Sequence, residues 1–378
     1  MTSSQINSGW LAGRRIRVLI VDDSMFIRNI VGRIFREEPA IEVVGTAVDG
    51  LDAIVKVSEL KPDVVTLDVE MPRMTGIEAI RKIRAAWPPV KIIMLSTLTE
   101  SGARVTIDAL LNGANDYVSK SNPDGSNELP IPRLKHDLIA KIRQFFPARA
   151  TGPPPASPVI AKPLMVVAPS AGSPRPAVTQ RATRQRRVLA IGVSTGGPSA
   201  LSEVIPALPA NLPVPVLIVQ HMPPMFTRIL AERLDTVCPL HVREAVENAP
   251  VEAGTVLIAP GDYHMRVTRR GARECITLDQ SAPENSCRPA VDVLFRSVDE
   301  VYGGGSVAVV LTGMGQDGYL AARSLKASGA YVIAQDEGSS VVWGMPGMVA
   351  RAGLADAVVD LKRVAPEILK QFQSRMRT

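Results

Sequence analysis

Cysteines, aromatic side chains and long apolar runs are all scarce in this sequence. Only three of the 378 residues are cysteines, Cys238, Cys275 and Cys287, and their spacing fits neither a disulfide framework nor a zinc site. No apolar run is long enough to span a membrane, and the first fifteen residues lack the core of a signal peptide. We therefore expect a cytoplasmic protein that does not insert into a membrane.

Aromatic residues make up only 4% of the sequence, and this scarcity bears on its net charge of +6. The excess positive charge is concentrated in one short tract without interleaved aromatic residues, formed by Arg175, Arg181, Arg184, Arg186 and Arg187. Surfaces that bind nucleic acids commonly combine basic residues with aromatic side chains that stack on bases. We interpret the tract as a solvated linker and expect no nucleic-acid partner.

The length and composition indicate more than one domain. A chain of 378 residues is long enough for two or three domains, and a hydrophobic content of 46% supports full cores. Nine prolines lie between residues 147 and 176, mixed with alanine, serine and valine. Such a segment forms neither a helix nor a sheet ladder, and it indicates a semi-rigid, extended linker. Residues 1–13 are predicted to be a disordered tail.

The N-terminal part alternates apolar strands with amphipathic helices. This alternation predicts a doubly wound parallel sheet, in which ligands gather at the C-terminal ends of the strands. The predicted strands span residues 16–22, 41–47, 64–69, 91–97 and 116–120, and the predicted helices span 25–37, 50–60, 76–86, 103–113 and 133–145.

Polar residues follow most of these predicted strands and suggest one chemical site. Asp22 and Asp23 follow the first strand, Asp68 ends the third, Ser96 follows the fourth and Lys120 follows the fifth. Three converging carboxylates repel one another and need a cation, and an all-oxygen ligand set suits Mg²⁺. A lysine and a hydroxyl can then hold phosphoryl oxygens. Each residue alone also fits a cap, a turn or a surface charge, but their coincidence at successive strand ends favours a single site.

These residues lie in motifs that resemble the receiver domain of response regulators. The motifs are VDDSMFIR, TLDVEMPRMTGIEAI, MLSTLT and DYVSK, and the resemblance covers roughly residues 14–134. It implies a flavodoxin-like fold in which a partner histidine kinase phosphorylates Asp68. It also implies roles for further residues: Asp22, Asp23, Asp68 and the backbone carbonyl of Glu70 as Mg²⁺ ligands, Ser96 and Lys120 as phosphoryl contacts, and Tyr117 as the switch aromatic.

The C-terminal part begins with a strand, a glycine-rich turn and a helix. Residues 188–192 are apolar or small, and the turn after them carries Ser194 directly before a helix N-terminus. There the serine hydroxyl lies clear of the sheet, and free backbone N–H groups can stabilise an oxyanion. Residues 192–196 match G-x-S-x-G, the nucleophile-elbow pattern. A phosphate-binding turn is an equally good interpretation of this stretch alone. The remaining pattern predicts a mostly parallel α/β domain with an antiparallel portion in residues 240–280.

A serine nucleophile needs a base, and one of the four histidines has the right placement. His221 follows the predicted strand 214–220 and so reaches the same sheet edge as Ser194. His136 is expected on a helix surface, His241 at the start of a strand and His264 on a turn where it could line a substrate site. Asp317 follows another strand at this edge and can orient the histidine, although a cap on the next helix is the alternative.

The longer motifs resemble the catalytic domain of the chemotaxis protein-glutamate methylesterases, the CheB family. They are IGVSTGGPSAL, VQHMPPMFT, APGDYHM, LTGMGQDG and DEGSSVVWGMP, within residues 185–375. The resemblance implies a receiver domain at 14–134, a helix end and linker at 135–186, and a catalytic domain at 187–375. It also implies Ser194 as nucleophile, His221 as base and Asp317 as orienting acid, with Thr195, Gly196 and Met314 as an oxyanion site or active-site flank.

The same resemblance implies the reaction and its control. Glutamate γ-methyl esters on methyl-accepting chemotaxis receptors would be hydrolysed with release of methanol, receptor glutamines would be deamidated, and the hydrolysis would need no cofactor. We expect the receiver to cover Ser194 until Asp68 is phosphorylated. Two alternatives remain in the sequence: a phosphorylation-switched DNA-binding regulator, and an output module that binds a nucleotide through the turn at Ser194.

Overall fold

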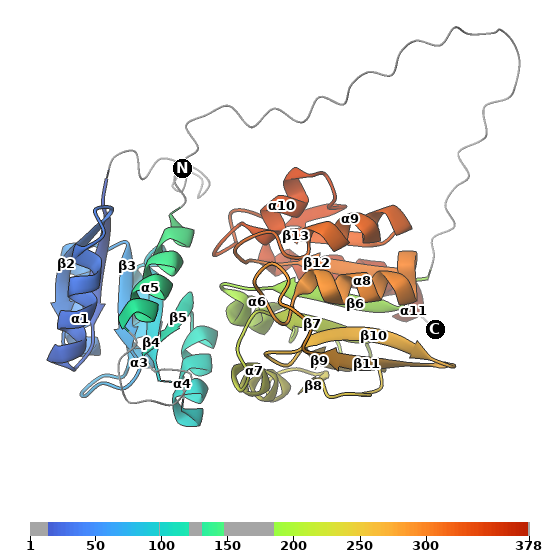
Figure 1. The fold of residues 1–378 in the computed structure, drawn as a ribbon, viewed down its shortest axis with the longest axis horizontal. Coiled ribbons are helices and arrows are strands. Elements are labelled where there is room, and N and C mark those ends of the chain that lie inside the picture. Colours follow the sequence, from blue (N-terminus) through green and yellow to red (C-terminus); the bar gives the residue numbers. More distant parts are fainter. Residues whose placement is uncertain (1–13, 98, 121–130, 147–184, 377–378) are drawn as a thin grey trace, which may run out of the picture.

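The protein consists of two α/β units that lie side by side (Figure 1). A computed structural model describes residues 14–97, 99–120, 131–146 and 185–376. The tail expected at residues 1–13 and most of the predicted linker, residues 147–184, lie outside the described residues. Among those described, no helix combines the length and the apolar character needed to cross a bilayer.

The N-terminal unit is a parallel five-stranded sheet with the order β2-β1-β3-β4-β5. This arrangement confirms the expected doubly wound fold. Its strands are β1 (Ile16–Val21), β2 (Ile41–Ala47), β3 (Val64–Asp68), β4 (Lys91–Ser96) and β5 (Asp116–Ser119), and its helices are α1 (Met25–Arg36), α2 (Gly50–Leu60), α3 (Gly76–Ala86), α4 (Glu100–Leu111) and α5 (Ile131–Phe145).

Local sequence explains where the helices of this unit begin. The carboxylate of Asp49 accepts hydrogen bonds from the first amides of α2. Thr75 and Glu78 form a capping box that starts α3. Apolar side chains of α1 and α5 pack on one face of the sheet, while those of α2, α3 and α4 pack on the other. Both faces are therefore covered, and the strand ends remain as the place for a site.

The C-terminal unit is a parallel seven-stranded sheet with the order β14-β13-β12-β6-β7-β9-β8. The antiparallel portion expected in residues 240–280 is confirmed only in its second half, by the two-stranded hairpin of β10 (His264–Arg270) and β11 (Arg273–Asp279), because the strands at 241–244 and 255–258 pair in parallel. The sheet strands are β6 (Val188–Val193), β7 (Val216–Gln220), β8 (His241–Glu244), β9 (Thr255–Ile258), β12 (Ser306–Val310), β13 (Tyr331–Gln335) and β14 (Ala357–Val359).

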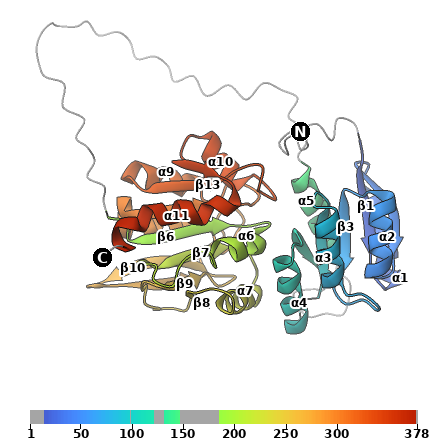
Figure 2. The ribbon, with the colours of Figure 1, turned by 180° about the vertical axis from the view of Figure 1, so that it is seen from behind.

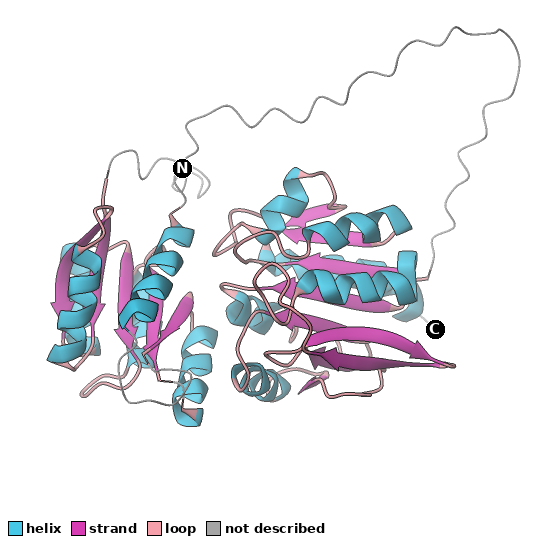
Figure 3. Cartoon of the chain, viewed as in Figure 1, coloured by secondary structure: helices cyan, strands magenta, loops and turns pink. Residues whose placement is uncertain are grey.

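Helices cover this second sheet on both sides (Figure 3). They are α6 (Gly197–Val204), α7 (Phe226–Asp235), α8 (Val291–Tyr302), α9 (Tyr319–Ser328), α10 (Met345–Arg351) and α11 (Leu361–Met376), with a short 3₁₀ turn, η2 (Gly303–Gly305). Neither α10 nor β14 was expected from the sequence, because both are too short to show a clear period of apolar residues.

The two units face each other through α4, β5 and α5 on one side and α6 and α7 on the other (Figure 1, Figure 2). One cluster of buried apolar side chains runs continuously through both units. The C-terminal strand ends of the second sheet, where Ser194 lies, point toward this interface. The fold thus places the two predicted sites on neighbouring parts of one molecule.

Candidate active site and phosphorylation site

Ser194 lies where the fully buried strand β6 turns into α6. Its backbone N–H donates to the Thr312 carbonyl at 3.0 Å, and its carbonyl accepts from the Gly197 N–H at 2.8 Å. Gly196 has a φ of 78°, and a Cβ at Gly197 would collide with the side-chain oxygen of Gln220. Both glycines are required, one by the left-handed backbone and the other by close packing. The turn therefore presents the serine in a defined position.

Two buried polar residues outside the predicted site support this turn. Thr312 donates its hydroxyl to the Thr195 carbonyl at 2.9 Å, and its N–H donates to the Gln335 side chain at 2.8 Å. Thr312 and Gln335 are almost fully buried. Sequence reasoning missed them, although each is a polar residue at the end of an apolar strand.

His221 follows β7 and meets Asp317 at the same edge of the sheet. The backbone N–H of His221 donates to the Val193 carbonyl at 3.1 Å, which holds the histidine at the end of β6. Its Nε2 lies 2.8 Å from Asp317 Oδ2. The structure therefore brings together the predicted base and its orienting acid, although they are 96 residues apart in the sequence.

The Asp317 carboxylate is buried, and several N–H groups compensate its charge. It accepts hydrogen bonds from the first amides of α8, Val291 at 2.6 Å and Asp292 at 3.0 Å, and from the Asn285 side chain at 2.9 Å. The expected alternative of a cap on the following helix is wrong: α9 begins at Tyr319, and its N-cap is Gly318, without a side-chain cap. Asp317 instead caps α8, so one carboxylate anchors a helix and holds the histidine.

This environment shifts both pKa values. Burial alone would raise the pKa of Asp317, but the hydrogen bond with His221 and the α8 amides lower it overall. Burial opposes the charge on His221, yet the hydrogen bonds with Asp317 and Cys287 outweigh that effect and raise its pKa to about 9. The arrangement seen here therefore favours the protonated form of His221.

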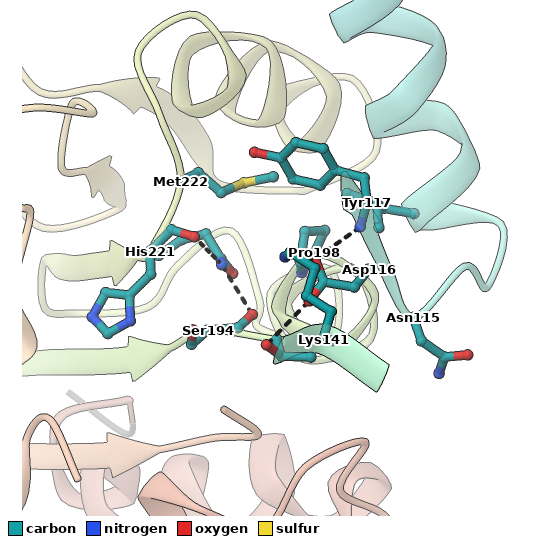
Figure 4. A pocket seen from close by; sticks show the side chains of 12 residues that line it. Asn115, Asp116, Tyr117, Lys141, Ser194, Pro198, His221 and Met222 are labelled. Carbon is teal, nitrogen blue, oxygen red and sulfur yellow. Dashed lines mark hydrogen bonds and ion pairs between the residues drawn. The ribbon is translucent and has the colours of Figure 1, made fainter. Parts of the chain in front are cut away.

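The serine and the histidine lie on adjacent strand ends beside one pocket (Figure 4). Among the residues that the structure describes, the Ser194 hydroxyl makes no hydrogen bond with His221. Catalytic hydrogen bonds are often long in unliganded enzymes and tighten with substrate. The Thr195 and Gly196 N–H groups find no acceptor within the described chain, so they can serve as oxyanion donors. Met314, on the turn before Asp317, is 55% exposed.

The predicted phosphorylation site is an acidic pocket at the strand ends of the first sheet. Oxygen atoms of Asp22, Asp23 and Asp68 lie within 4.8 Å of one another. The Lys120 ammonium lies 2.8 Å from Asp68 and 3.4 Å from Asp22. Burial and the neighbouring Asp68 raise the pKa of Asp22 despite Lys120, so the pocket is short of positive charge. This donor set fits a hard divalent cation such as Mg²⁺.

The remaining receiver-type residues are divided between this pocket and the interface. Glu70 is exposed in the turn two residues beyond Asp68. The Ser96 hydroxyl bonds to the Thr106 hydroxyl and to backbone carbonyls at the start of α4. Tyr117 stacks on Phe226 of the second unit, with ring centroids 4.7 Å apart. The predicted switch aromatic therefore contacts the other domain directly.

The first unit covers the surroundings of Ser194. The Thr195 hydroxyl lies 3.3 Å from the Asp116 carboxylate and 3.2 Å from the Gln144 amide oxygen. A cavity of about 90 Å³ remains between the units, lined by Ser194 and His221 on one side and by Tyr117 and Lys141 on the other (Figure 4). Side chains of the receiver therefore share one pocket with Ser194 and His221.

Comparisons with known proteins agree with this arrangement. Residues 18–127 match the family model "Response regulator receiver domain", and residues 189–368 match the model "CheB methylesterase". A Nocardioides protein named protein-glutamate methylesterase/protein-glutamine glutaminase is 51% identical over 94% of this chain and 95% of its own. The chain belongs to this family. The relative of the same name from Trichodesmium erythraeum is 45% identical over 95% of this chain and 99% of its own.

A solved structure is similar to the catalytic half. The methylesterase catalytic domain of Thermotoga maritima CheB is 42% identical and covers 49% of this chain and 98% of its own, with a TM-score of 0.48. The family membership confirms the predicted fold class and enzyme class, a hydrolase controlled by a receiver domain. It favours the methylesterase over the two alternatives, a DNA-binding output and a nucleotide-binding module, because residues 189–368 match the methylesterase model.

The other three histidines take no part in the catalytic pocket. The expectation that His264 lies on a turn is wrong: it begins β10, is fully buried, and bonds to the Ala282 carbonyl and the Ala290 N–H. The two ring nitrogens of His264 are thus satisfied by backbone. His241 is exposed at the start of β8, and His136 is exposed on α5.

Proposed function

We propose that Ser194, His221 and Asp317 form the catalytic triad of a methylesterase that acts on chemoreceptors. The reaction would hydrolyse glutamate γ-methyl esters on receptor signalling helices and release methanol, and it would also deamidate receptor glutamines. The observation that carries this proposal is the 2.8 Å hydrogen bond between His221 and Asp317, at the strand end next to Ser194. Three side chains from three strand ends then have the roles of nucleophile, base and orienting acid.

The geometry favours one nitrogen of His221 as the base in this mechanism. Because Asp317 holds Nε2, Nδ1 is the atom that accepts the proton from Ser194. The serine oxygen then attacks the ester carbonyl, and the Thr195 and Gly196 amides stabilise the oxyanion. Methanol, or ammonia from a glutamine, leaves with the proton from His221, and water hydrolyses the acyl-enzyme. The residues that act on the substrate need no cofactor.

We propose the receiver domain as the control element. Asp22, Asp23, Asp68 and the Glu70 carbonyl would hold Mg²⁺, which neutralises carboxylate charge while a chemotaxis histidine kinase supplies the phosphoryl group to Asp68. Lys120 already forms an ion pair with Asp68. The Ser96 hydroxyl would leave its hydrogen bond with Thr106 and turn toward the phosphoryl oxygens. Tyr117, stacked on Phe226, would carry this change to the interface and uncover Ser194.

The partners follow from this proposal. The kinase and the signalling helices of methyl-accepting receptors would both meet the enzyme in the cytoplasm. The small cavity at Ser194 supports a covered resting state, since a receptor helix cannot reach the serine while the domains are packed together.

The test is methanol release from methylated chemoreceptor membranes, with and without a small-molecule phosphodonor and Mg²⁺. We expect the phosphodonor to stimulate release by the full chain. Ser194→Ala should abolish release, while Asp68→Asn should keep the basal rate and lose the stimulation. Release that persists in Ser194→Ala would mean that another residue is the nucleophile.

A further inference from the structure

A thiol lies beside the catalytic histidine. Cys287 Sγ is 3.5 Å from His221 Nδ1, on the side of the ring opposite the Asp317 hydrogen bond. The cysteine is partly exposed in the segment between β11 and α8. Neither the motifs of the sequence nor the proposed mechanism uses it.

The backbone around Cys287 is well held. Glu284 and Cys287 exchange two backbone hydrogen bonds, at 3.1 and 2.8 Å, across a turn in which Asn285 and Ser286 have positive φ values. The Glu284 carboxylate bonds to Arg296 of α8 at 2.5 Å, and the Asn285 side chain bonds to Asp317 at 2.9 Å. This turn is therefore fastened both to a helix and to the triad acid, which keeps the thiol next to the imidazole.

The position of the thiol matters because a neutral imidazole has only one acceptor nitrogen. With Nε2–H donating to Asp317, the lone pair is on Nδ1. The Ser194 hydroxyl must donate to this lone pair for general-base catalysis. A Cys287 S–H that donates to Nδ1 occupies the same lone pair, and when the ring is protonated its Nδ1–H bonds to the sulfur instead. In either form Ser194 has to displace Cys287.

Other charged groups around the ring do not provide this contact. Asp317 holds the opposite nitrogen, and the Asp292 carboxylate of α8 is linked to the Asp317 carboxylate through the Asn285 side chain. Lys141 and Asp116 of the receiver face the pocket but bond to each other at 2.5 Å. Cys287 is therefore the group on Nδ1 among the residues that the structure describes.

We propose that Cys287 is a positioning residue that competes with Ser194 for His221 Nδ1 and so holds the base in an unproductive arrangement. This inference rests on the proposed triad. The receiver restrains activity by covering Ser194. The Cys287 contact is a second restraint on activity, and it lies within the catalytic domain. The contact also contributes to the high pKa of His221, so its removal should lower that pKa.

The test is the pH dependence of kcat/KM for methanol release by the full chain, activated by phosphodonor and Mg²⁺. In Cys287→Ala we expect a rise of about two- to tenfold at pH 7, the value of one weak hydrogen bond, and an acid limb displaced to lower pH. Cys287→Ser keeps a hydrogen-bond donor, so its kcat/KM and its acid limb should stay close to those of the wild type. Cys275→Ala removes a buried cysteine of β11 that is remote from His221, and it is the matched control.

Three results would overturn the inference. They are a fall in kcat with an unmoved acid limb in Cys287→Ala, the same change in Cys275→Ala, and loss of activity in Cys287→Ala while Ser194→Ala stays active. The last result would make Cys287 the nucleophile. Failure of the triad itself appears separately, as methanol release by Ser194→Ala when Cys287→Ala also keeps its activity.

A second measurement needs no esterase activity. Alkylation of the three cysteines by iodoacetamide can be followed by mass spectrometry in the wild type and in His221→Gln. Because a neighbouring imidazole promotes thiolate reactivity, the rate at Cys287 should fall severalfold in the variant, with Cys238 and Cys275 unchanged as internal controls. Equal rates at Cys287 in both proteins would contradict the contact.

Discussion

The receiver and catalytic domains build their sites by the same topology but balance charge differently. In both, a parallel sheet brings side chains from separate strands to one edge. In the receiver, three carboxylates lie together, two of them share Lys120, and the pKa of Asp22 is raised. In the catalytic domain, the Asp317 carboxylate accepts hydrogen bonds from the first amides of α8 and from His221, and its pKa is lowered. The first site therefore gathers more carboxylates than its lysine pairs with, while in the second the N–H groups of the fold compensate the single carboxylate.

The strongest test of this contrast removes the charge of Asp317. Asp317→Asn should lower kcat by about 10⁴-fold, because the histidine loses its carboxylate partner and its orientation. Methanol release by the phosphodonor-activated chain measures this effect. Asp292→Asn is the matched control: it is a buried carboxylate nearby that bonds to the Ala321 N–H and not to His221. A comparable loss in Asp292→Asn would mean that general disruption of α8, rather than the triad, explains the result.

The same variant tests the ion pair through stability. The folded-state pKa of His221 is raised from 6.5 to about 9, so the pair stabilises the fold fully below pH 6.5. This stabilisation is lost as the pH rises through about 9. The urea midpoint of the wild type should therefore fall between pH 6.5 and pH 9, and Asp317→Asn should lack this part of the fall. Parallel curves for the two proteins would contradict the raised pKa.

An intermediate effect is expected at the aromatic contact that joins the two domains. Phe226→Ala removes the stack on Tyr117, which is worth about 0.5–1.5 kcal/mol beyond its buried area. The unstimulated rate should rise about two- to tenfold, since the covered state loses that stabilisation. Phe226→Leu keeps apolar bulk and should give a smaller rise. An unchanged basal rate in both variants would show that the stack does not keep the domains together.

The smallest effect is expected at the charged edge of the interface. Three ion pairs join α4 to α7 there: Arg104 with Glu232, Arg228 with Glu100, and Arg233 with Asp108. Exposed pairs of this kind contribute about 0.2–1 kcal/mol each and weaken with salt. Raising the ionic strength should increase the unstimulated rate less than threefold. Arg233→Ala should show a weaker salt response than the wild type. A fall in rate with salt would contradict an electrostatic contribution to the cover.

Much of the fold and of both sites could be predicted from local patterns. Apolar strands of five to seven residues alternate with amphipathic helices, so β6, β7 and β12 were readable, and with them the positions of Ser194, His221 and Asp317 at strand ends. The receiver motifs predicted Asp68 as the phosphorylated residue and Lys120 as a phosphoryl contact. The short elements α10 and β14 were missed because three to seven residues carry too little periodicity.

Other features depend on side chains that meet only in three dimensions. Thr312 and Gln335 support the serine turn from segments more than 100 residues away in the sequence, and their place at strand ends does not show that they contact it. His264 is a residue type common in active sites, but both of its ring nitrogens bond to backbone groups. This is visible only once the hairpin β10–β11 places the side chain. The contact of Cys287 with His221 joins residues 66 positions apart.

The sequence by itself determined two α/β domains, their order, and which polar residues stand at strand ends, since these depend on short-range periodicity and turn chemistry. Tertiary structure alone decided that Asp317 caps α8 while holding His221, that a thiol faces Nδ1, and that Tyr117 stacks on Phe226. These contacts depend on the relative placement of distant segments. That placement is set by packing over whole surfaces, which no local stretch of sequence encodes.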